Sequence, residues 1–201
     1  MNNHSLLNKK KKIAVFASGS GTNAQNLIEY FKNSPFGKVE LVFTNNSNAK
    51  VVERAKKLEV KTFVFNRNEL YTTPIVLNKL NSAKIDLIVL AGFLLKFPES
   101  ILNQYSNKVI NIHPALLPKY GGKGMYGMNV HKAVVENQEI ESGITIHFVN
   151  ENYDEGKIIF QAKTKVLPSD TAESVASKIH KLEQKYFPKV VEELIERELN
   201  G

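Results

Sequence analysis

The sequence contains no cysteine, which excludes disulfide bonds and any chemistry that needs a thiolate. Its five histidines are scattered without the close spacing of a zinc site, so we expect no metal. No apolar run approaches the ~20 residues that a membrane-spanning helix needs, and the first residues lack the apolar stretch of a signal peptide. Composition therefore predicts a soluble, cytoplasmic protein without a membrane partner.

Positive charge is in excess, with a formal net charge of +7. The run Lys9 to Lys12 supplies a large part of it, and we interpret residues 1–11 as a solvated basic tail rather than a nucleic-acid-binding arm. No basic segment is interleaved with aromatic residues, so we expect no nucleic-acid partner, and the remaining surplus suits an anionic small substrate. With 42% hydrophobic residues and no composition shift along 201 residues, the chain predicts one domain over residues 12–201.

Strand patterns alternate with helix patterns through the first half of the chain. The strand runs are residues 13–17, 39–43, 61–65 and 85–91, and the helix patterns lie after residue 23 and over residues 50–58 and 70–82, with Pro74 expected in the first turn of the last helix. Two longer strands, 143–149 and 157–166, have no helix between them and predict an antiparallel hairpin before a closing helix near Thr171. The pattern indicates an α/β fold with a doubly wound, mostly parallel sheet.

An amide and an imidazole at the end of a further strand run carry the strongest chemical signal. Asn111 and His113 alternate around one apolar residue, so both side chains point to one face. Pro114 ends the strand and leaves them at its carboxyl end, where open α/β sheets bind ligands. If Asp154 folds back onto His113, the three form an acid–base and oxyanion-stabilising group that suits direct acyl transfer to an amine.

The protonation state of His113 enters this interpretation. Only a small upward shift of the pKa from ~6.5 would leave the imidazole charged near neutral pH. A lone histidine after a strand is more often a structural residue, and that alternative stays open.

A glycine loop follows the first strand run. Gly19 and Gly21 permit a tight turn, and the amides of Gly21, Thr22 and Asn23 then point from a helix N-terminus that favours an anion. The loop is also a weak dinucleotide fingerprint, but Asn45 stands where a nicotinamide enzyme places an acid for the ribose hydroxyls. We therefore expect a phosphate monoester, with an NAD-dependent enzyme as the weaker alternative.

The segment Tyr120–Met128 is rich in glycine and follows His113 closely. Ordering such a backbone costs conformational entropy, so we expect a lid that closes when substrates bind. A passive surface loop is the alternative.

Four motifs, taken together and in this order, resemble the phosphoribosylglycinamide formyltransferases. They are Gly19-x-Gly21-Thr22-Asn23, Leu90-Ala-Gly-Phe93, Asn111-Ile-His-Pro-Ala-Leu-Leu-Pro118 and Gly143-x-Thr-x-His-x-Val-x-x-x-x-Asp154-x-Gly156. The resemblance implies a Rossmann-like formyltransferase fold, as a monomer or homodimer. It also implies transfer of a formyl group from 10-formyltetrahydrofolate to the amine of glycinamide ribonucleotide, a step of de novo purine synthesis.

Position by position, the resemblance implies a role for each matching residue. Catalysis falls to Asn111, His113 and Asp154, phosphate binding to Gly21, Thr22 and Asn23, ribose binding to Glu183, and folate binding to Leu90, Leu95, Phe97, Val149 and Glu151. Many relatives carry Arg where Leu95 stands, so a contact made by that arginine is not expected here.

Other functions remain compatible with the same motifs. A formyltransferase acting on a sugar nucleotide or on methionyl-tRNA shares the chemistry, although such relatives usually carry an additional C-terminal domain. A non-catalytic nucleotide-binding module, with His113 as a structural residue, is the alternative from another class.

Overall fold

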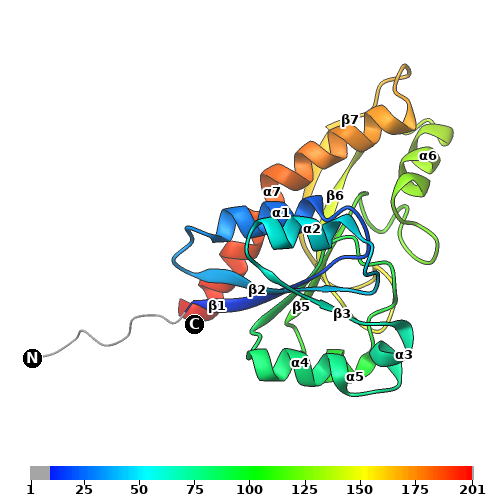
Figure 1. Ribbon diagram of the computed structural model, residues 1–201. Coiled ribbons are helices and arrows are strands. Elements are labelled where there is room, and N and C mark those ends of the chain that lie inside the picture. The colour runs from blue at the N-terminus through cyan, green and yellow to red at the C-terminus, as the bar shows by residue number, and fades with distance from the viewer. Residues whose placement is uncertain (1–9, 201) are drawn as a thin grey trace, which may run out of the picture.

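The computed structural model describes residues 10–200, which form a sheet of seven strands with helices on both faces (Figure 1). The strands are β1 (Lys11–Phe16), β2 (Gly37–Thr44), β3 (Lys61–Val64), β4 (Leu87–Leu90), β5 (Val109–His113), β6 (Glu141–Phe148) and β7 (Ile158–Lys165). Their order in the sheet is β3-β2-β1-β4-β5-β6-β7. The first five pair in parallel, and β6 and β7 are antiparallel.

The helices connect and cover these strands. They are α1 (Thr22–Phe31), α2 (Lys50–Lys57), α3 (Arg67–Tyr71), α4 (Ile75–Ala83), α5 (Glu99–Gln104), α6 (Met128–Glu136) and α7 (Ala172–Asn200). In Figure 1, α1, α2 and α7 lie on one face of the sheet, and α3, α4 and α5 lie on the other. Within residues 10–200, no helix is both long and apolar enough to cross a membrane.

Strand β1 shows why both faces are covered. Its side chains alternate between faces, with Ile13 and Val15 in one apolar cluster and Ala14 and Phe16 in the other. All four are fully buried. A strand that is apolar at consecutive positions needs a helix layer on each side, as expected of a central parallel strand.

The strand order reverses between β1 and β4, which are neighbours in the sheet although β2 and β3 lie between them in sequence. The loops after two such strands run in opposite directions. A crevice therefore forms at the carboxyl ends of the strands, where α/β sheets bind ligands. The glycine loop leaves β1, and Ala91 and Gly92 follow β4. The fold therefore places a binding crevice between these loops and the end of β5.

The predicted α/β fold, with its mostly parallel sheet and antiparallel hairpin, is confirmed. The single helix expected over residues 70–82 is wrong, because α3 and α4 are separate helices. Pro74 lies at the N-cap of α4 rather than inside a first turn; since proline has no N–H, a continuous helix cannot hydrogen-bond there. The sequence patterns also missed α5 and α6. Most of the predicted basic tail lies outside the described residues, whereas Lys11 already belongs to β1.

Candidate active site

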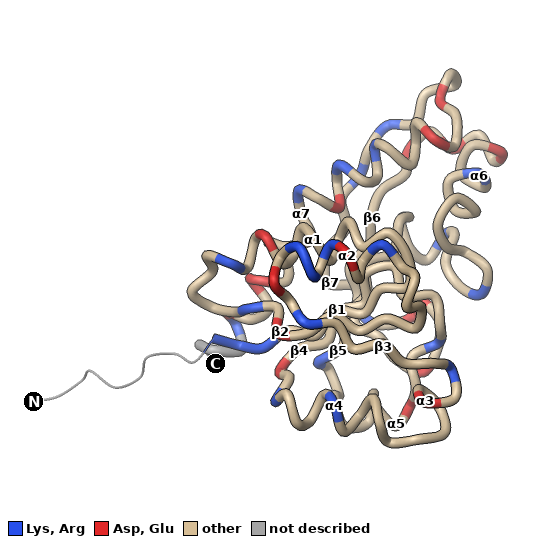
Figure 2. The backbone as a smooth tube through the Cα atoms, in the orientation of Figure 1, with Lys and Arg blue, Asp and Glu red and all other residues tan. Residues whose placement is uncertain are grey.

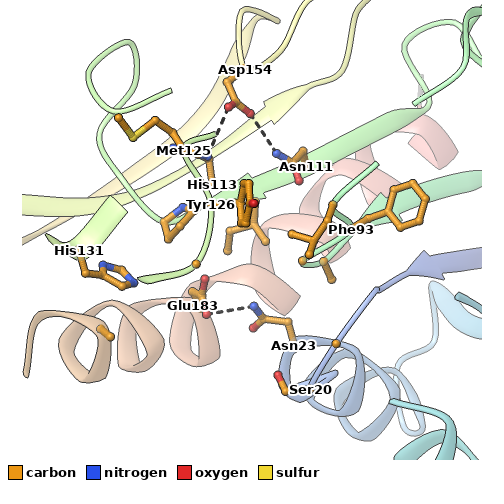
Figure 3. Close-up of a pocket in the computed structure, with 18 of the residues that line it drawn as sticks. Ser20, Asn23, Phe93, Asn111, His113, Met125, Tyr126, His131, Asp154 and Glu183 are labelled. Atoms are coloured by element: carbon orange, nitrogen blue, oxygen red, sulfur yellow. Dashed lines mark hydrogen bonds and ion pairs between the residues drawn. The ribbon is translucent and has the colours of Figure 1, made fainter. Parts of the chain in front are cut away.

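A cavity of about 540 Å³ opens at the carboxyl ends of β1, β4 and β5 (Figure 3). Asn111 and His113 enter it from β5, and Asp154 enters from the β6–β7 connection. The alternation expected for the two β5 residues holds, and Ile112 between them packs into the core. The structure thus brings together three side chains that are widely separated in sequence.

Asp154 faces both β5 residues (Figure 3). Its Oδ1 lies 3.5 Å from Nδ2 of Asn111, and its Oδ2 lies 3.6 Å from Nδ1 of His113. The backbone N–H of Gly122 donates to Oδ2 over 2.9 Å. Asp154 has a φ of 57°, in the left-handed region that L-residues rarely adopt. This turn aims the carboxylate at the end of β5.

Gly156 allows the Asp154 turn to return to the sheet. A Cβ at this position would lie 1.7 Å from the carbonyl oxygen of Phe148. Only a residue without a side chain permits this approach of two backbones. The glycine that follows Asp154 in the sequence motif is thereby explained by packing.

His147 completes the polar group around Asn111, a role that the sequence did not suggest. It lies opposite Asn111 in the antiparallel β5–β6 pair, and its Nε2 is 3.1 Å from Asn111 Nδ2. Its Nδ1 lies 2.9 Å from the carbonyl oxygen of Phe148, which can only accept, so Nδ1 carries a hydrogen. Nε2 thus lies against both the Asn111 amide and Oδ1 of Asp154, 3.6 Å from the latter, and these contacts fix the orientation of the amide.

Both ring nitrogens of His113 face oxygen atoms. Nε2 lies 2.7 Å from the carbonyl oxygen of Tyr120, and Nδ1 faces Asp154. Burial lowers the pKa of His113, an effect that the charge of Asp154 and the Tyr120 carbonyl oppose but do not cancel. The expected upward shift of this pKa is therefore wrong in direction. The imidazole is neutral near pH 7, and it donates through Nε2.

Burial alone would raise the pKa of the Asp154 carboxyl group. The contact of Oδ1 with Nε2 of His147, the proximity of His113 and the Gly122 amide outweigh burial, so the net shift of the pKa is downward. Asp154 is thus a carboxylate at neutral pH. The site combines a charged acceptor with two neutral N–H donors, Asn111 and His113.

The opposite wall of the cavity holds the glycine loop. Gly21 is the N-cap of α1 and has a φ of 72°, and Thr22 and Asn23 begin the helix. All three line the cavity, so the start of α1, with its unpaired amides, opens into it. Nε of Arg54 on α2 donates to the Ser20 carbonyl over 2.9 Å. Helix α2 also carries Lys50, Lys56 and Lys57, and Figure 2 shows positive side chains along it, so the helix beside this loop has an excess of positive charge.

Glu183 of α7 lies across from Asn23, whose Nδ2 donates to its Oε2 over 3.0 Å (Figure 3). His180 lies 3.4 Å from the same oxygen. The apolar stripe predicted for this helix is present, with Val175 and Ile179 buried, so that Glu183 stands at its edge. Glu183 therefore lines the same cavity as the glycine loop.

A second, smaller pocket of about 60 Å³ adjoins the first on the side of β4. Four of the predicted folate residues line it, namely Leu90, Leu95, Phe97 and Val149. Glu151 does not; it borders a neighbouring polar hollow together with Val149. Asn111 and Asp154 line both the large cavity and the small pocket. Asn111 and Asp154 therefore lie where the large cavity and the small pocket meet.

The chain is similar to known proteins in both sequence and fold. Residues 11–191 match the family profile described as Formyl transferase. The chain is 34% identical to the phosphoribosylglycinamide formyltransferase of Bacillus subtilis, over 92% of this chain and 95% of that protein. The chain belongs to the phosphoribosylglycinamide formyltransferases. The chloroplastic member from Arabidopsis thaliana is 36% identical over 95% of this chain and 68% of its own length. The solved structure of the member from Anaplasma phagocytophilum has a TM-score of 0.85 at 33% identity, covering 94% of this chain and 89% of that one.

Several groups at the site of this formyltransferase give no clear signal in the sequence. The backbone of Tyr120 and Gly122 reaches His113 and Asp154, and no side-chain pattern signals a backbone contact. His147 was visible as an alternating residue in its motif, and pairing of its strand with β5 would have placed it opposite Asn111. His131 lines the large cavity from α6, a helix that was not predicted.

Proposed function

We propose that the chain transfers the formyl group of 10-formyltetrahydrofolate directly to the amine of glycinamide ribonucleotide, with Asn111, His113 and Asp154 as the catalytic residues. One observation carries this proposal: Asn111 and Asp154 line both the large cavity and the small pocket. A group that passes between two bound molecules must cross a point that both can reach. The polar group stands at such a point.

The large cavity suits the nucleotide. The amides at the start of α1 can bind its phosphate, aided by the helix dipole, and Gly21 permits close approach of the backbone. Glu183 can accept hydrogen bonds from the ribose hydroxyl groups. This assignment places the phosphate at one end of the cavity and leaves the glycinamide amine near His113.

The small pocket suits part of the folate. Leu90, Leu95 and Phe97 make part of its lining apolar, and Asn111 and Asp154 add polar atoms to it. In this assignment the ring system enters between the β4 loop and the Asp154 loop. The formyl group on N10 of the folate then points toward Asn111.

Attack of the neutral amine on the formyl carbon forms a tetrahedral centre with a negative oxygen and a cationic nitrogen. Neutral His113 donates one N–H to that oxygen once the Tyr120 carbonyl gives way, and Asn111 donates a second, because its 3.5 Å contact with Asp154 is long. Asp154 accepts the proton of the amine through a water molecule and returns it to N10 by the same route, and the C–N10 bond then breaks to release tetrahydrofolate.

The direct test mixes the purified protein with 10-formyltetrahydrofolate and one acceptor at a time. We expect tetrahydrofolate to form with glycinamide ribonucleotide and not with an amino-sugar nucleotide or methionyl-tRNA. Consumption with either of the other acceptors alone would assign the chain to that reaction. Binding of the nucleotide without any transfer would favour the non-catalytic module.

The location and assembly of the protein belong to the same proposal. We infer a cytoplasmic enzyme, a monomer or homodimer, with small-molecule substrates only. The name of the Arabidopsis relative places that protein in the chloroplast.

A further inference from the structure

His131 is a buried polar residue that neither the fold nor the mechanism uses. It lies on α6, the helix that follows the glycine-rich loop, and its relative exposure is 6%. Its neighbours Val130 and Val134 pack into the protein interior, whereas the His131 ring lines the large cavity. In Figure 3 the ring lies on the side of the cavity where Glu183 stands.

The Nδ1 atom of His131 has no hydrogen-bond partner in the described part of the chain. A buried polar atom without a partner costs about 1–3 kcal/mol, and folded proteins rarely leave one unsatisfied. The other such atom among the described residues belongs to Ser142, which does not line the cavity. His131 forms part of the cavity wall, but Nδ1 itself is closed to solvent, so the ring must turn about its Cβ–Cγ bond to present Nδ1 to a ligand and offset this cost.

The charged groups around His131 narrow the choice of ligand group. Burial lowers the pKa of His131, the charge of Glu183 opposes this, and His113 adds to it, so the ring is neutral at neutral pH. Asn23 and His180 both contact Glu183 through its Oε2 atom. Within the described residues, Oε1 receives no hydrogen bond. The neutral His131 ring and the Glu183 carboxylate thus line the same part of the cavity (Figure 3).

We propose that His131 is a substrate-binding residue and that Nδ1 pairs with one hydroxyl of the ribose while Glu183 accepts from the other. The assignment rests on the proposed function, which puts the ribose beside Glu183. A hydroxyl group both donates and accepts, so it pairs with Nδ1 in either tautomer of the ring. Two neighbouring hydroxyls match a carboxylate oxygen and an adjacent neutral nitrogen.

The test compares His131→Leu with His131→Asn by calorimetric titration with glycinamide ribonucleotide. The two replacements have the same shape, but only asparagine keeps a hydrogen-bonding group near the position of Nδ1. We expect the leucine variant to bind roughly tenfold more weakly, the effect of losing one hydrogen bond, and the asparagine variant to stay within about threefold of wild type. Equal affinities of wild type and the leucine variant would overturn the proposal.

Two further readouts separate substrate binding from a structural role. The 2′-deoxy and 3′-deoxy forms of the nucleotide should each be titrated, and the leucine penalty should vanish for one of them; the same penalty for all three ligands would overturn the assignment to a hydroxyl. Without ligand, the leucine variant should melt at or above the wild-type temperature, because it removes an unsatisfied buried atom. Melting several degrees lower would show that the ring is structural.

Failure of this inference is distinguishable from failure of the proposed function. A wild-type protein that neither binds glycinamide ribonucleotide nor formylates it would refute the function itself. A wild-type protein that does both, beside a leucine variant with unchanged affinity, would refute only the role of His131.

Discussion

Replacing Gly21 by alanine should strongly destabilise the folded protein, because the glycine loop has no room for a side chain at this position. An added Cβ would lie 2.5 Å from both Cβ and Cγ2 of Val51 and 2.7 Å from its Cα. The last of these atoms is backbone, so a change of rotamer at Val51 cannot relieve the contact. Helix α2 would have to move away from the loop.

The magnitude follows from two effects. An L-residue in the left-handed region, where Gly21 has a φ of 72°, costs about 1–2 kcal/mol. Forcing an extra methyl group into a packed contact typically costs about 1–3 kcal/mol. Together we expect the free energy of unfolding to fall by about 2–5 kcal/mol, a large share of the ~5–15 kcal/mol typical of a domain.

Urea denaturation of the ligand-free protein, followed by circular dichroism, measures this change. Gly19→Ala is the matched control, since nothing lies within 4 Å of a Cβ at Gly19. This variant should unfold within about 0.5 kcal/mol of wild type, as ordinary surface substitutions do. If Gly21→Ala unfolds as the control does, the loop geometry is wrong. The close approach of the backbone to a phosphate, which depends on that geometry, would then be wrong as well.

Further predictions concern other parts of the molecule. In an NMR titration, His113 should have a pKa below 6.5, and Asp154→Asn should lower this pKa further, because the carboxylate charge raises it. Turnover should fall as the pH drops through this pKa, because protonation removes the neutral imidazole. An increase in turnover over that range would contradict the role of neutral His113 as a donor. Tyr30 donates to Glu192 over 2.7 Å, which raises the pKa of Tyr30 to about 12, so Tyr30→Phe should lower the free energy of unfolding by about 1–3 kcal/mol in denaturation experiments, and no loss would exclude this tie between α1 and α7. Trypsin should cut after Lys123 in the free protein and not when both substrates are bound, because the segment Tyr120–Met128 then closes over the site. Equal cleavage rates would show that this segment is not a lid.

The sheet was predictable because its strands are apolar at consecutive or alternating positions. Residues 13–17 and 85–91 could hardly form anything but central strands, and their alternation with helix patterns indicated the parallel order. The sequence predicts one helix in place of α3 and α4 because apolar spacing continues across Pro74. Proline has no N–H and therefore interrupts the hydrogen bonds of a continuous helix there. Helix α5 has only 6 residues, too few to give a clear period.

The candidate site was predictable where a side chain occupies a strand end or a motif position. Asn111 and His113 could be assigned to one face from alternation alone. The link to Asp154 needed the resemblance, because no local pattern shows where a long loop returns. The pKa of His113 could not be predicted, since its direction depends on how deeply β5 is covered and on the Tyr120 carbonyl. His131 was missed because its helix was missed.

The most direct test of the central claim, that Asn111, His113 and Asp154 perform the transfer where the two substrates meet, is a single-turnover measurement with Asp154→Asn. Both substrates are present at saturation, and their affinities are measured separately. Asparagine keeps the shape of the side chain and removes its charge and its ability to take a proton. We expect both dissociation constants to stay within about threefold of wild type and the rate of formyl transfer to fall by about 10²–10⁴, the range for loss of a general acid–base group. A rate close to wild type, or a loss fully accounted for by weaker binding, would contradict the account.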